Sequence, residues 1–266
     1  MDFLELKQIK DETERVQKTY ELFDESSRLN CGKASRVEFL TTVRYIERYL
    51  HNGDRILDIG AGAGEYSLYF ARNGYEVSAI ELAESNIRAF RQKLRPGDNV
   101  DLRQGNALDL SYYGDESFDT VLLLGPLYHL QALEDRKQCI TEAMRVCRKG
   151  GHIFFAFIGN DMVIMTEFQY SSDYFAKGDY DRESFRLEDF PFVFHTVDAA
   201  KSLLNECGIT PIHAVAADGF SELMADKING LSDEDYGQYL RYHFYICEKP
   251  EFLGASNHLL FVAEKG

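Results

Sequence analysis

The stretch DIGAGAGE at Asp58–Glu65 decides the fold. It begins within the short apolar run Ile56–Ile59, which is typical of a buried strand. It ends where a helical pattern over Glu65–Asn73 begins. Small residues at a strand-to-helix turn let the backbone approach a ligand, and the helix amides can then face that ligand. The stretch therefore predicts a nucleotide-like site within a β-α-β unit. A tight turn without a ligand is the alternative interpretation.

Strand and helix patterns alternate on both sides of this turn. Upstream, Arg36–Leu50 carries apolar residues at helical spacing. Downstream, the patterns predict strands at 75–80, 100–103, 120–124, 152–158, 209–217 and 258–264, and helices at 84–94, 133–147 and 196–206. Such alternation is typical of an α/β protein with a doubly wound, Rossmann-like parallel sheet that is covered by helices on both faces.

Two long segments, 159–195 and 220–257, interrupt the alternation and are rich in Tyr, Phe, Asp and Glu. Segments of this length usually form lids or caps over a site. Chain that leaves the carboxyl end of a parallel strand emerges at the ligand-binding edge of the sheet, and both segments follow strands. We expect a helical N-terminal cap segment at 1–50 and one domain at 51–266, with both insertions over the same crevice.

Composition and charge exclude several classes of protein. The chain has 44 acidic against 29 basic side chains, a net charge of −15 that repels phosphate backbones and anionic lipid. Its five cysteines form an odd count without a C-x-x-C pair, which indicates neither a disulfide framework nor a zinc site. No apolar run approaches the roughly 20 residues of a membrane span. We expect a cytoplasmic protein with no metal, nucleic-acid or membrane partner.

Residues after the next two strands indicate which nucleotide would bind. Glu81 ends the second strand, where a carboxylate can accept hydrogen bonds from both ribose hydroxyls, and Asn106 follows the third, where its amide can meet an adenine edge. The NAD fingerprint G-x-G-x-x-G needs Gly or Ala where this chain has Glu65. Asp58 would repel a pyrophosphate but suits an ammonium or sulfonium cation. The pattern favours an adenosyl cofactor other than NAD.

Residues 58–64 resemble motif I, D/E-x-G-x-G-x-G, of the class I S-adenosylmethionine-dependent methyltransferases. Glu81 matches that family's ribose-binding acid, Asn106-Ala107 its adenine-contacting pair, and 118–124 its fourth strand. The closing helix, strand and reversed last strand match 196–206, 209–217 and 258–264, so the resemblance covers about residues 36–266. It implies a mostly parallel sheet with an antiparallel last strand. The implied cofactor-binding residues are Asp58, Gly60, Ala61, Gly62, Gly64, Glu81, Leu82, Asn106, Ala107, Leu124 and Arg28.

The segment Gly125–Leu130, together with 28–39 and 253–258, resembles a group of bacterial methyltransferases and implies no particular substrate. Nucleic-acid enzymes that methylate amino groups carry an Asn/Asp-Pro-Pro-aromatic tetrad after this strand. Here the tetrad is Gly-Pro-Leu-Tyr, which has no side-chain carbonyl to hold an exocyclic amine. DNA base methylation is therefore not expected.

Methyl transfer from a sulfonium is an in-line displacement that needs a base only if the acceptor arrives protonated. His129 and Tyr128 follow the fourth strand and are the candidate catalytic residues, with a structural histidine bonded to a backbone carbonyl as the alternative. Arg28 or Arg36 could bind the cofactor carboxylate, unless both are surface charges on a helix. The remaining candidates, for which we expect packing roles, are His195, His243 and His258.

The aromatic and acidic side chains of the two insertions allow two interpretations. They form either an aromatic mini-core under a solvated acidic face or a pocket that favours a neutral or cationic small molecule. We expect methyl transfer from S-adenosylmethionine to such an acceptor, with S-adenosylhomocysteine as the product. Two alternatives are a non-catalytic adenosyl-binding or protein-interaction module and an NAD-dependent oxidoreductase, which Glu65 and the reversed last strand disfavour. The sequence does not indicate an oligomeric state.

Overall fold

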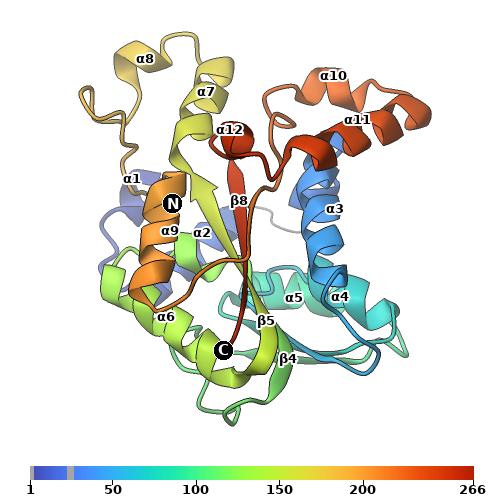
Figure 1. Cartoon of the computed structure of the whole chain (residues 1–266). Coiled ribbons are helices and arrows are strands. Elements are labelled where there is room, and N and C mark those ends of the chain that lie inside the picture. Colours follow the sequence, from blue (N-terminus) through green and yellow to red (C-terminus); the bar gives the residue numbers. More distant parts are fainter. Residues whose placement is uncertain (1–2, 23–26) are drawn as a thin grey trace.

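The structure, a computed structural model, describes residues 3–22 and 27–266 and has a mixed sheet between layers of helices (Figure 1). The strands are β1 Arg55–Ile59, β2 Glu76–Glu81, β3 Val100–Gln104, β4 Phe118–Leu123, β5 Cys147–Gly159, β6 Phe194–His195, β7 His213–Ala216 and β8 His258–Glu264. The helices are α1 Phe3–Leu6, α2 Glu12–Leu22, α3 Lys33–Glu47, α4 Glu65–Arg72, α5 Glu84–Lys93, α6 Leu133–Val146, α7 Asn160–Tyr170, α8 Tyr174–Lys177, α9 Val197–Glu206, α10 Ala225–Asn229, α11 Asp233–Ile246 and α12 Pro250–Leu253. Two short 3-10 turns, η1 Arg28–Asn30 and η2 Pro126–Tyr128, complete the set.

The strand order is β3-β2-β1-β4-β5-β8-β7, with the two-residue β6 paired to the end of β5. Strands β1 to β5 pair in parallel, whereas β8 runs antiparallel to both β5 and β7. This arrangement confirms the expected doubly wound α/β fold with a reversed last strand. Because β1 lies between β2 and β4, the turns that follow these three strands meet at one edge of the sheet.

The inner strands β1, β4 and β8 are buried on both faces, which explains why they are largely apolar. Val121 and Leu123 of β4 belong to a core cluster that includes residues of α6 and α9. The intervening Leu122 belongs to a second cluster that includes residues of α3 and α4. Successive residues of a strand point to opposite faces, so each face needs its own apolar set.

Several boundaries differ from the sequence-based prediction; the strand expected at 152–158, for example, begins at Cys147. The helix expected at 36–50 begins at Lys33 and ends at Glu47. The strand expected at 209–217 is shorter, since its first residues instead complete the end of α9, where the Ile209 amide donates to the Leu204 carbonyl. The helix expected at 196–206 begins at Val197, because the Thr196 hydroxyl accepts the Ala199 amide and caps α9, and His195 belongs to β6.

The two insertions rise from the same end of the molecule (Figure 1). The first forms α7 and α8 and the second forms α10, α11 and α12, on either side of the start of β8. Two helices of the N-terminal segment contact the rest of the chain: α3 packs against α10, and α2 packs against α5. The division into a cap segment at 1–50 and a domain at 51–266 stays a prediction.

Within residues 3–22 and 27–266, the structure contains no helix with both the length and the apolar character that crossing a membrane requires.

Candidate active site

Glycine is required at two positions of the turn between β1 and α4. Gly60 and Gly64 have φ angles of +73° and +84°, a region that side chains strongly disfavour. A Cβ at Gly60 would lie 2.7 Å from the Pro126 ring, and one at Gly64 would lie 2.5 Å from the buried Phe90 ring. The turn therefore keeps its shape only with glycine at these positions.

Substituting Gly64 with Ala should lower the free energy of unfolding by more than about 1 kcal/mol, because the new methyl group adds a clash to an unfavourable φ. The matched control is Gly237→Ala on α11, where a Cβ meets nothing within 4 Å and alanine favours the helix. Denaturant unfolding of the two variants measures the difference. Equal stability would contradict the steric account of the turn.

Three amides of this turn bind the neighbouring strand. Those of Gly60 and Ala61 donate to the Ile80 carbonyl at 2.8 and 3.0 Å, and that of Gly62 donates to the Glu81 carboxylate at 2.8 Å. These three groups tie the turn to β2, whereas the expectation that amides of the following helix face a ligand stays a prediction. A pyrophosphate-binding loop needs free amides, so this geometry disfavours a dinucleotide.

The first of three neighbouring hollows, here named the Glu81 pocket, lies after β2 and β3. Its lining consists of Val16, Tyr20, Gly60, Ile80, Glu81, Leu82, Gly105, Asn106, Ala107, Gly125, Pro126, His129 and Leu130. The Glu81 carboxylate is buried, which raises its pKa, while donors that include the amides of Ala83 and Gly62 lower it. Asn106 accepts the Leu108 amide at Oδ1, which leaves its Nδ2 to donate. Both side chains present polar atoms of the kind that recognise an adenosine.

Helix α2, which belongs to the N-terminal segment expected to form a cap, borders the Glu81 pocket. Val16 and Tyr20 line the pocket, and the Tyr20 carbonyl accepts the Ser85 hydroxyl at 3.2 Å. The pattern of α2 is an ordinary amphipathic one, so nothing in it indicates which groove the helix covers.

The second hollow, the Asp58 pocket, adjoins the first and shares Tyr20, Gly60 and Gly125 with it. Its lining consists of Tyr20, Arg28, Leu29, Asp58, Gly60, Ala61, Gly62, Ala63, Glu65, Tyr66, Leu124, Gly125 and Tyr128. Of the predicted cofactor-binding residues, all but Gly64 line one of these two pockets. Gly64 instead lies against Phe90.

Asp58 is a buried carboxylate that receives a hydrogen bond from the Ser67 hydroxyl at 2.6 Å. Burial raises the pKa of Asp58 to about 7, with a further contribution from the charge of Glu81, while Ser67 lowers it. In the part of the chain that the structure describes, no cationic side chain forms an ion pair with Asp58. A buried carboxylate in this state favours a cationic ligand.

The two candidate arginines lie in different surroundings. Arg28 donates to both carboxylate oxygens of Glu38, at 2.7 and 3.3 Å, and lines the Asp58 pocket. Arg36 stacks on the Phe39 ring at 3.8 Å and lines a separate surface hollow. Of the two, Arg28 is the one positioned at the predicted site.

The candidate catalytic residues lie beside the first two pockets. His129 is buried and shares a hydrogen bond of 2.7 Å with the Tyr20 hydroxyl at Nε2. Burial lowers the pKa of His129 to about 3, aided by the charges of Arg15 and Arg28. The Tyr128 hydroxyl donates to the Leu124 carbonyl at 2.9 Å. A neutral histidine of this kind is a weak base, although its catalytic role stays a prediction.

The third hollow, the His258 cavity, has a volume of about 400 Å³ and shares Arg28 with the Asp58 pocket. Its lining consists of Arg28, Cys31, Gly32, Ala34, Ser35, Glu38, Tyr170, Asp218, Ser221, Glu222, Ala225, Asn229 and His258. Residues of the N-terminal segment and of both insertions therefore border this cavity, whereas neither insertion lines the first two pockets.

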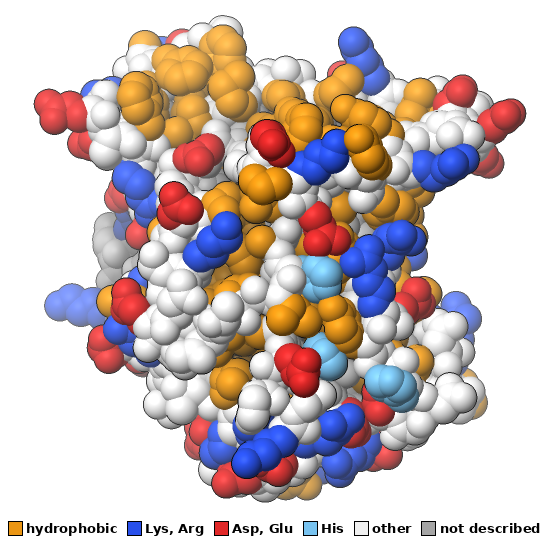
Figure 2. Space-filling view, viewed as in Figure 1, with side chains coloured by type: hydrophobic (Ala, Val, Ile, Leu, Met, Phe, Trp, Pro, Cys, Tyr) orange, Lys and Arg blue, Asp and Glu red, His pale blue; other side chains and the backbone are white. Residues whose placement is uncertain are grey.

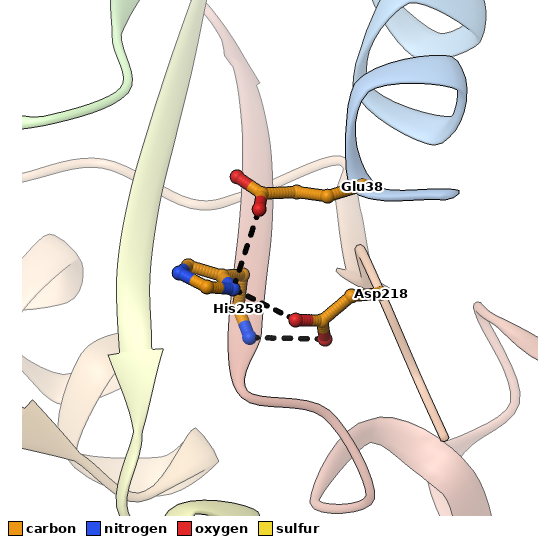
Figure 3. Close-up of side chains that lie close together, drawn as sticks. All are labelled: Glu38, Asp218 and His258. Atoms are coloured by element: carbon orange, nitrogen blue, oxygen red, sulfur yellow. Dashed lines mark hydrogen bonds and ion pairs between the residues drawn. The ribbon is translucent and has the colours of Figure 1, made fainter. Parts of the chain in front are cut away.

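Sequence reasoning missed a cluster of three titratable side chains in this cavity (Figure 3). His258 Nδ1 lies 2.7 Å from Asp218 Oδ2 and 3.4 Å from Glu38 Oε2. The three residues come from α3, the segment after β7, and the start of β8, and we expected only packing from His258. No local motif could have indicated them, because tertiary folding alone brings them together.

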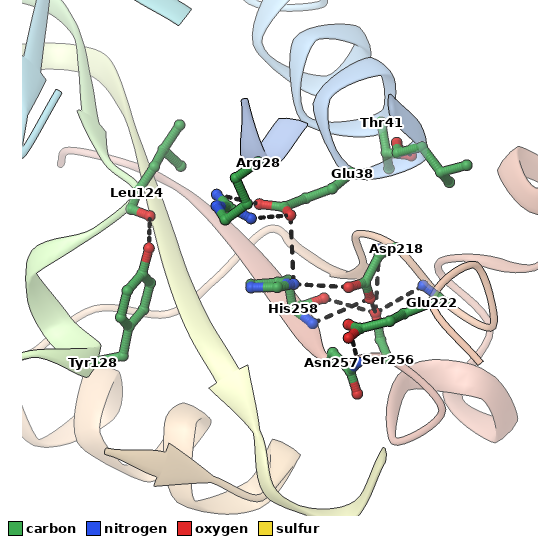
Figure 4. Close-up of polar contacts among 12 residues, drawn as sticks. Arg28, Glu38, Thr41, Leu124, Tyr128, Asp218, Glu222, Ser256, Asn257 and His258 are labelled. Carbon is green, nitrogen blue, oxygen red and sulfur yellow. Dashed lines mark hydrogen bonds and ion pairs between the residues drawn. The ribbon is translucent and has the colours of Figure 1, made fainter. Parts of the chain in front are cut away.

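The spacing of this cluster would also suit a metal ion, since one ligand atom from each residue lies within 4.8 Å of the others. Protein partners already occupy these atoms, however. Glu38 binds Arg28, and Asp218 accepts the Ser256 hydroxyl and the His258 amide (Figure 4). We assign no metal to the cluster.

The aromatic residues of the first insertion mostly contact one another. Ring pairs include Phe168–Phe175 at 5.0 Å and Tyr174–Tyr180 at 5.7 Å. Figure 2 shows hydrophobic side chains gathered on the surface over α7 and α8. Only Tyr170 of this insertion lines the His258 cavity. The rings therefore pack on one another at the surface, where Phe168, Phe175 and Phe185 are at least 39% exposed, and form neither a buried mini-core nor an aromatic pocket.

A known family matches the part of the chain that supplies most of the lining of the first two pockets. Residues 57–155 match the model of a methyltransferase domain family. This region is therefore similar to methyltransferase domains. It contains Asp58, Glu81, Asn106 and Leu124, so the match coincides with the turns that line the pockets.

Curated relatives match segments of about 100 to 120 residues of the chain. The demethylmenaquinone methyltransferase of Clavibacter sepedonicus is 33% identical over 101 residues, which are 38% of this chain and 40% of that protein. The ubiquinone biosynthesis O-methyltransferase of Pseudomonas fluorescens is 32% identical over 116 residues, or 43% and 49% of the two chains. The chain thus spans less than half the length of these relatives.

Solved structures share the fold over most of the chain. A SAM-dependent methyltransferase from Methanosarcina mazei has a TM-score of 0.54 at 22% identity, covering 83% of this chain and 96% of its own. The [4+2]-cyclase SpnF has a TM-score of 0.62 at 17% identity, with 95% and 96% covered. The second of these shows that the fold by itself does not specify the reaction.

Proposed function

We propose that the protein is an S-adenosylmethionine-dependent methyltransferase that methylates a small neutral or cationic molecule. The adenosine occupies the Glu81 pocket, the methionine portion occupies the Asp58 pocket, and the acceptor occupies the His258 cavity. The continuity of these three hollows supports the proposal, because Gly60 and Gly125 join the first to the second and Arg28 joins the second to the third.

The observation that carries the proposal is the buried Asp58 carboxylate at a turn whose amides are occupied. Such a site rejects a pyrophosphate, because three amides are committed and the carboxylate would repel it. It accepts a ligand that joins an adenosine to a cation. S-adenosylmethionine carries both an ammonium and a sulfonium, and it supplies the electrophilic methyl group.

Each polar group near the two pockets then has a defined task. Glu81 accepts the ribose hydroxyls, Asn106 Nδ2 donates to the adenine, and Asp58 accepts the methionyl ammonium. Arg28 binds the methionyl carboxylate and so exchanges part of its contact with Glu38 for the ligand. Tyr128 and the Leu124 carbonyl border the space that the reacting methyl group would occupy.

The charges of the His258 cavity favour a neutral or cationic acceptor over a polyanion. Its lining contains three carboxylates, from Glu38, Asp218 and Glu222, against Arg28 and the imidazole of His258. A cavity with excess negative charge raises the local concentration of cations and lowers that of anions. A screen in which only phosphorylated or polyanionic compounds were methylated would overturn this part of the proposal.

Calorimetric titration of ligand-free protein tests the cofactor directly. We expect micromolar binding of S-adenosylhomocysteine and no binding of NAD in a parallel titration. Absence of S-adenosylhomocysteine binding to folded protein would overturn the proposal. Binding of S-adenosylhomocysteine, with no methyl transfer from S-adenosylmethionine to any acceptor, would instead support a non-catalytic adenosyl-binding module.

Binding of S-adenosylhomocysteine should weaken as the pH falls below 7. The ligand's ammonium pairs with ionised Asp58, whose pKa is raised to about 7, so protonation of Asp58 competes with binding. The dissociation constant should rise about tenfold for each pH unit between 6.5 and 5. The control ligand, 5′-methylthioadenosine, lacks the ammonium and should show a smaller dependence. Identical pH profiles for the two ligands would contradict the role of Asp58.

A further inference from the structure

His258 lies where the His258 cavity meets the rest of the crevice. It begins β8 and pairs with Ile158 near the carboxyl end of β5, the same edge of the sheet at which the cofactor turns lie. Both His258 and Arg28 line the cavity, and Arg28 also lines the Asp58 pocket. The imidazole is therefore close to the boundary between the acceptor and cofactor sites of the proposed function.

Among the residues that the structure describes, the imidazole has polar side-chain contacts at Nδ1 alone. Asp218 is buried, receives the His258 backbone amide at 3.1 Å with Oδ1, and binds Nδ1 with Oδ2. The Ser256 hydroxyl donates to the same carboxylate and fixes its orientation. Figure 3 shows the ring with Nδ1 toward the two carboxylates and Nε2 pointing away from them. A carboxylate on Nδ1 selects the tautomer in which Nε2 is the basic atom.

We propose that His258 is the catalytic base of the methyl transfer, that Asp218 is its positioning residue, and that the acceptor is a neutral molecule with an acidic hydroxyl group. This inference rests on the proposed function and deepens it. The hydroxyl O–H bond breaks as its proton moves to His258 Nε2, and the oxygen electron pair forms the new bond to the methyl carbon. The carbon–sulfur bond breaks with its electrons left on sulfur, which yields the neutral thioether. The proton leaves Nε2 to solvent after product release.

The charged groups around His258 make it a stronger base than an ordinary histidine. Burial lowers its pKa, but Glu38 on α3 and Asp218 after β7 raise the pKa to about 9, against the opposing charge of Arg28 on η1. Proton transfer is most efficient between groups of similar pKa. A phenol or enol, with a pKa near the value of about 10 for tyrosine, therefore matches this base.

The charges of Arg28 and His258, between the His258 cavity and the Asp58 pocket, favour a hydroxyl over an ammonium group as the group that is methylated. Arg28 is cationic, and His258 is an imidazolium at neutral pH before it loses its proton. An ammonium directed at Nε2 would meet like charge, whereas a neutral hydroxyl would not. Glu222, whose carboxylate binds the neutral Asn257 amide, is available on the cavity wall for other polar groups of the acceptor.

Histidine NMR tests the dyad without any substrate. The protein is labelled with ¹⁵N-histidine and titrated from pH 5 to 10, and the His258 signals are assigned from their loss in His258→Gln. We expect the neutral form to carry its proton on Nδ1 and the titration midpoint to lie at pH 8 or above. The midpoint should fall by at least one unit in Asp218→Asn. A midpoint below 8, or a proton on Nε2 in the neutral form, would overturn the proposal.

Methyl transfer from tritiated S-adenosylmethionine tests the acceptor class. The probes are catechol, resorcinol and 4-nitrophenol, with benzylamine as the amine comparison. We expect labelled ethers, formed at a rate that increases with pH up to about 9 because His258 must be neutral to accept a proton. Labelled benzylamine without labelled ethers, or no labelled ether from any phenol, would overturn the hydroxyl assignment.

Variants separate the base from the cofactor site. His258→Gln should lower kcat for the methylated phenol at least a hundredfold and keep the dissociation constant for S-adenosylhomocysteine within twofold. Asp218→Asn should lower kcat and shift the pH profile to lower pH, and Asp218→Glu should restore part of both. The exposed His51 provides the matched control, as His51→Gln should change neither quantity. If the wild-type protein does not bind S-adenosylhomocysteine, the proposed function is wrong. If it binds normally and kcat is unchanged in His258→Gln, only the catalytic role of His258 and Asp218 is wrong.

Discussion

Replacing Asp58 with Asn should weaken binding of S-adenosylhomocysteine about tenfold to a hundredfold and leave binding of 5′-methylthioadenosine within twofold. The buried carboxylate accepts a charge-assisted hydrogen bond from the ligand's ammonium, an interaction worth about 1.5–3 kcal/mol. Asparagine keeps the size of the side chain but removes its charge. Since 5′-methylthioadenosine has no ammonium, its binding reports only on the adenosine contacts. Calorimetry with both ligands measures the difference.

The same substitution should not destabilise the ligand-free protein. Burial raises the pKa of Asp58 from its ordinary value to about 7, so ionising this group in the folded chain costs free energy. The cost is absent below about pH 4, grows through the interval up to 7, and is fully present above it. At pH 8 the unfolding temperature of Asp58→Asn should therefore equal or exceed that of the wild type. A large decrease, together with weaker binding of both ligands, would indicate a structural role instead.

Replacing Glu81 with Ala should weaken binding of both ligands to a similar degree. Both contain a ribose, and loss of the carboxylate removes charge-assisted hydrogen bonds worth about 1.5–3 kcal/mol, or roughly tenfold to a hundredfold in the dissociation constant. Binding of 5′-methylthioadenosine should therefore weaken in Glu81→Ala but not in Asp58→Asn. Unchanged affinity in Glu81→Ala would remove Glu81 from the ribose role.

Stability measurements are needed beside this affinity measurement because Glu81 also organises the turn. Its two oxygens accept the amides of Gly62 and Ala83 at 2.8 Å, and alanine would leave the partly buried Gly62 amide and the buried Ala83 amide without this partner. Glu81→Gln is the matched control, since its side-chain oxygen can still accept one of the two amides. We expect a lower unfolding temperature for Glu81→Ala than for Glu81→Gln. Equal values would mean that the amides find other acceptors at no cost.

Local patterns predicted most of the sheet because its strands are buried on both faces. The apolar runs of β1 and β4 and the boundaries of β8 follow from these patterns, and the structure confirms them. Predictions failed at element ends, such as the strand expected from residue 209 and the helix expected from residue 36. There the boundary depends on caps and single hydrogen bonds rather than on periodicity.

The residues around the glycine-rich turn could be predicted to lie together for a geometric reason. Asp58, Glu81 and Asn106 follow or end neighbouring parallel strands, and the carboxyl ends of such strands meet at one edge of the sheet. Their proposed contacts with a ligand stay predictions. The hydrogen bonds of the turn amides could not be predicted, because they depend on where the Ile80 carbonyl lies on the neighbouring strand β2.

By itself, the sequence determined most of the sheet, the turn that requires glycine, and the acidic and amide side chains at its edge, because each depends on patterns within single strands and turns that follow one another along the chain. Only the tertiary structure decided which surfaces close over that edge. Glu38, Asp218 and His258 come from three distant segments, and Tyr20 reaches His129 from the N-terminal helix. Their contacts arise from the packing of whole elements, and no spacing along the chain encodes that packing.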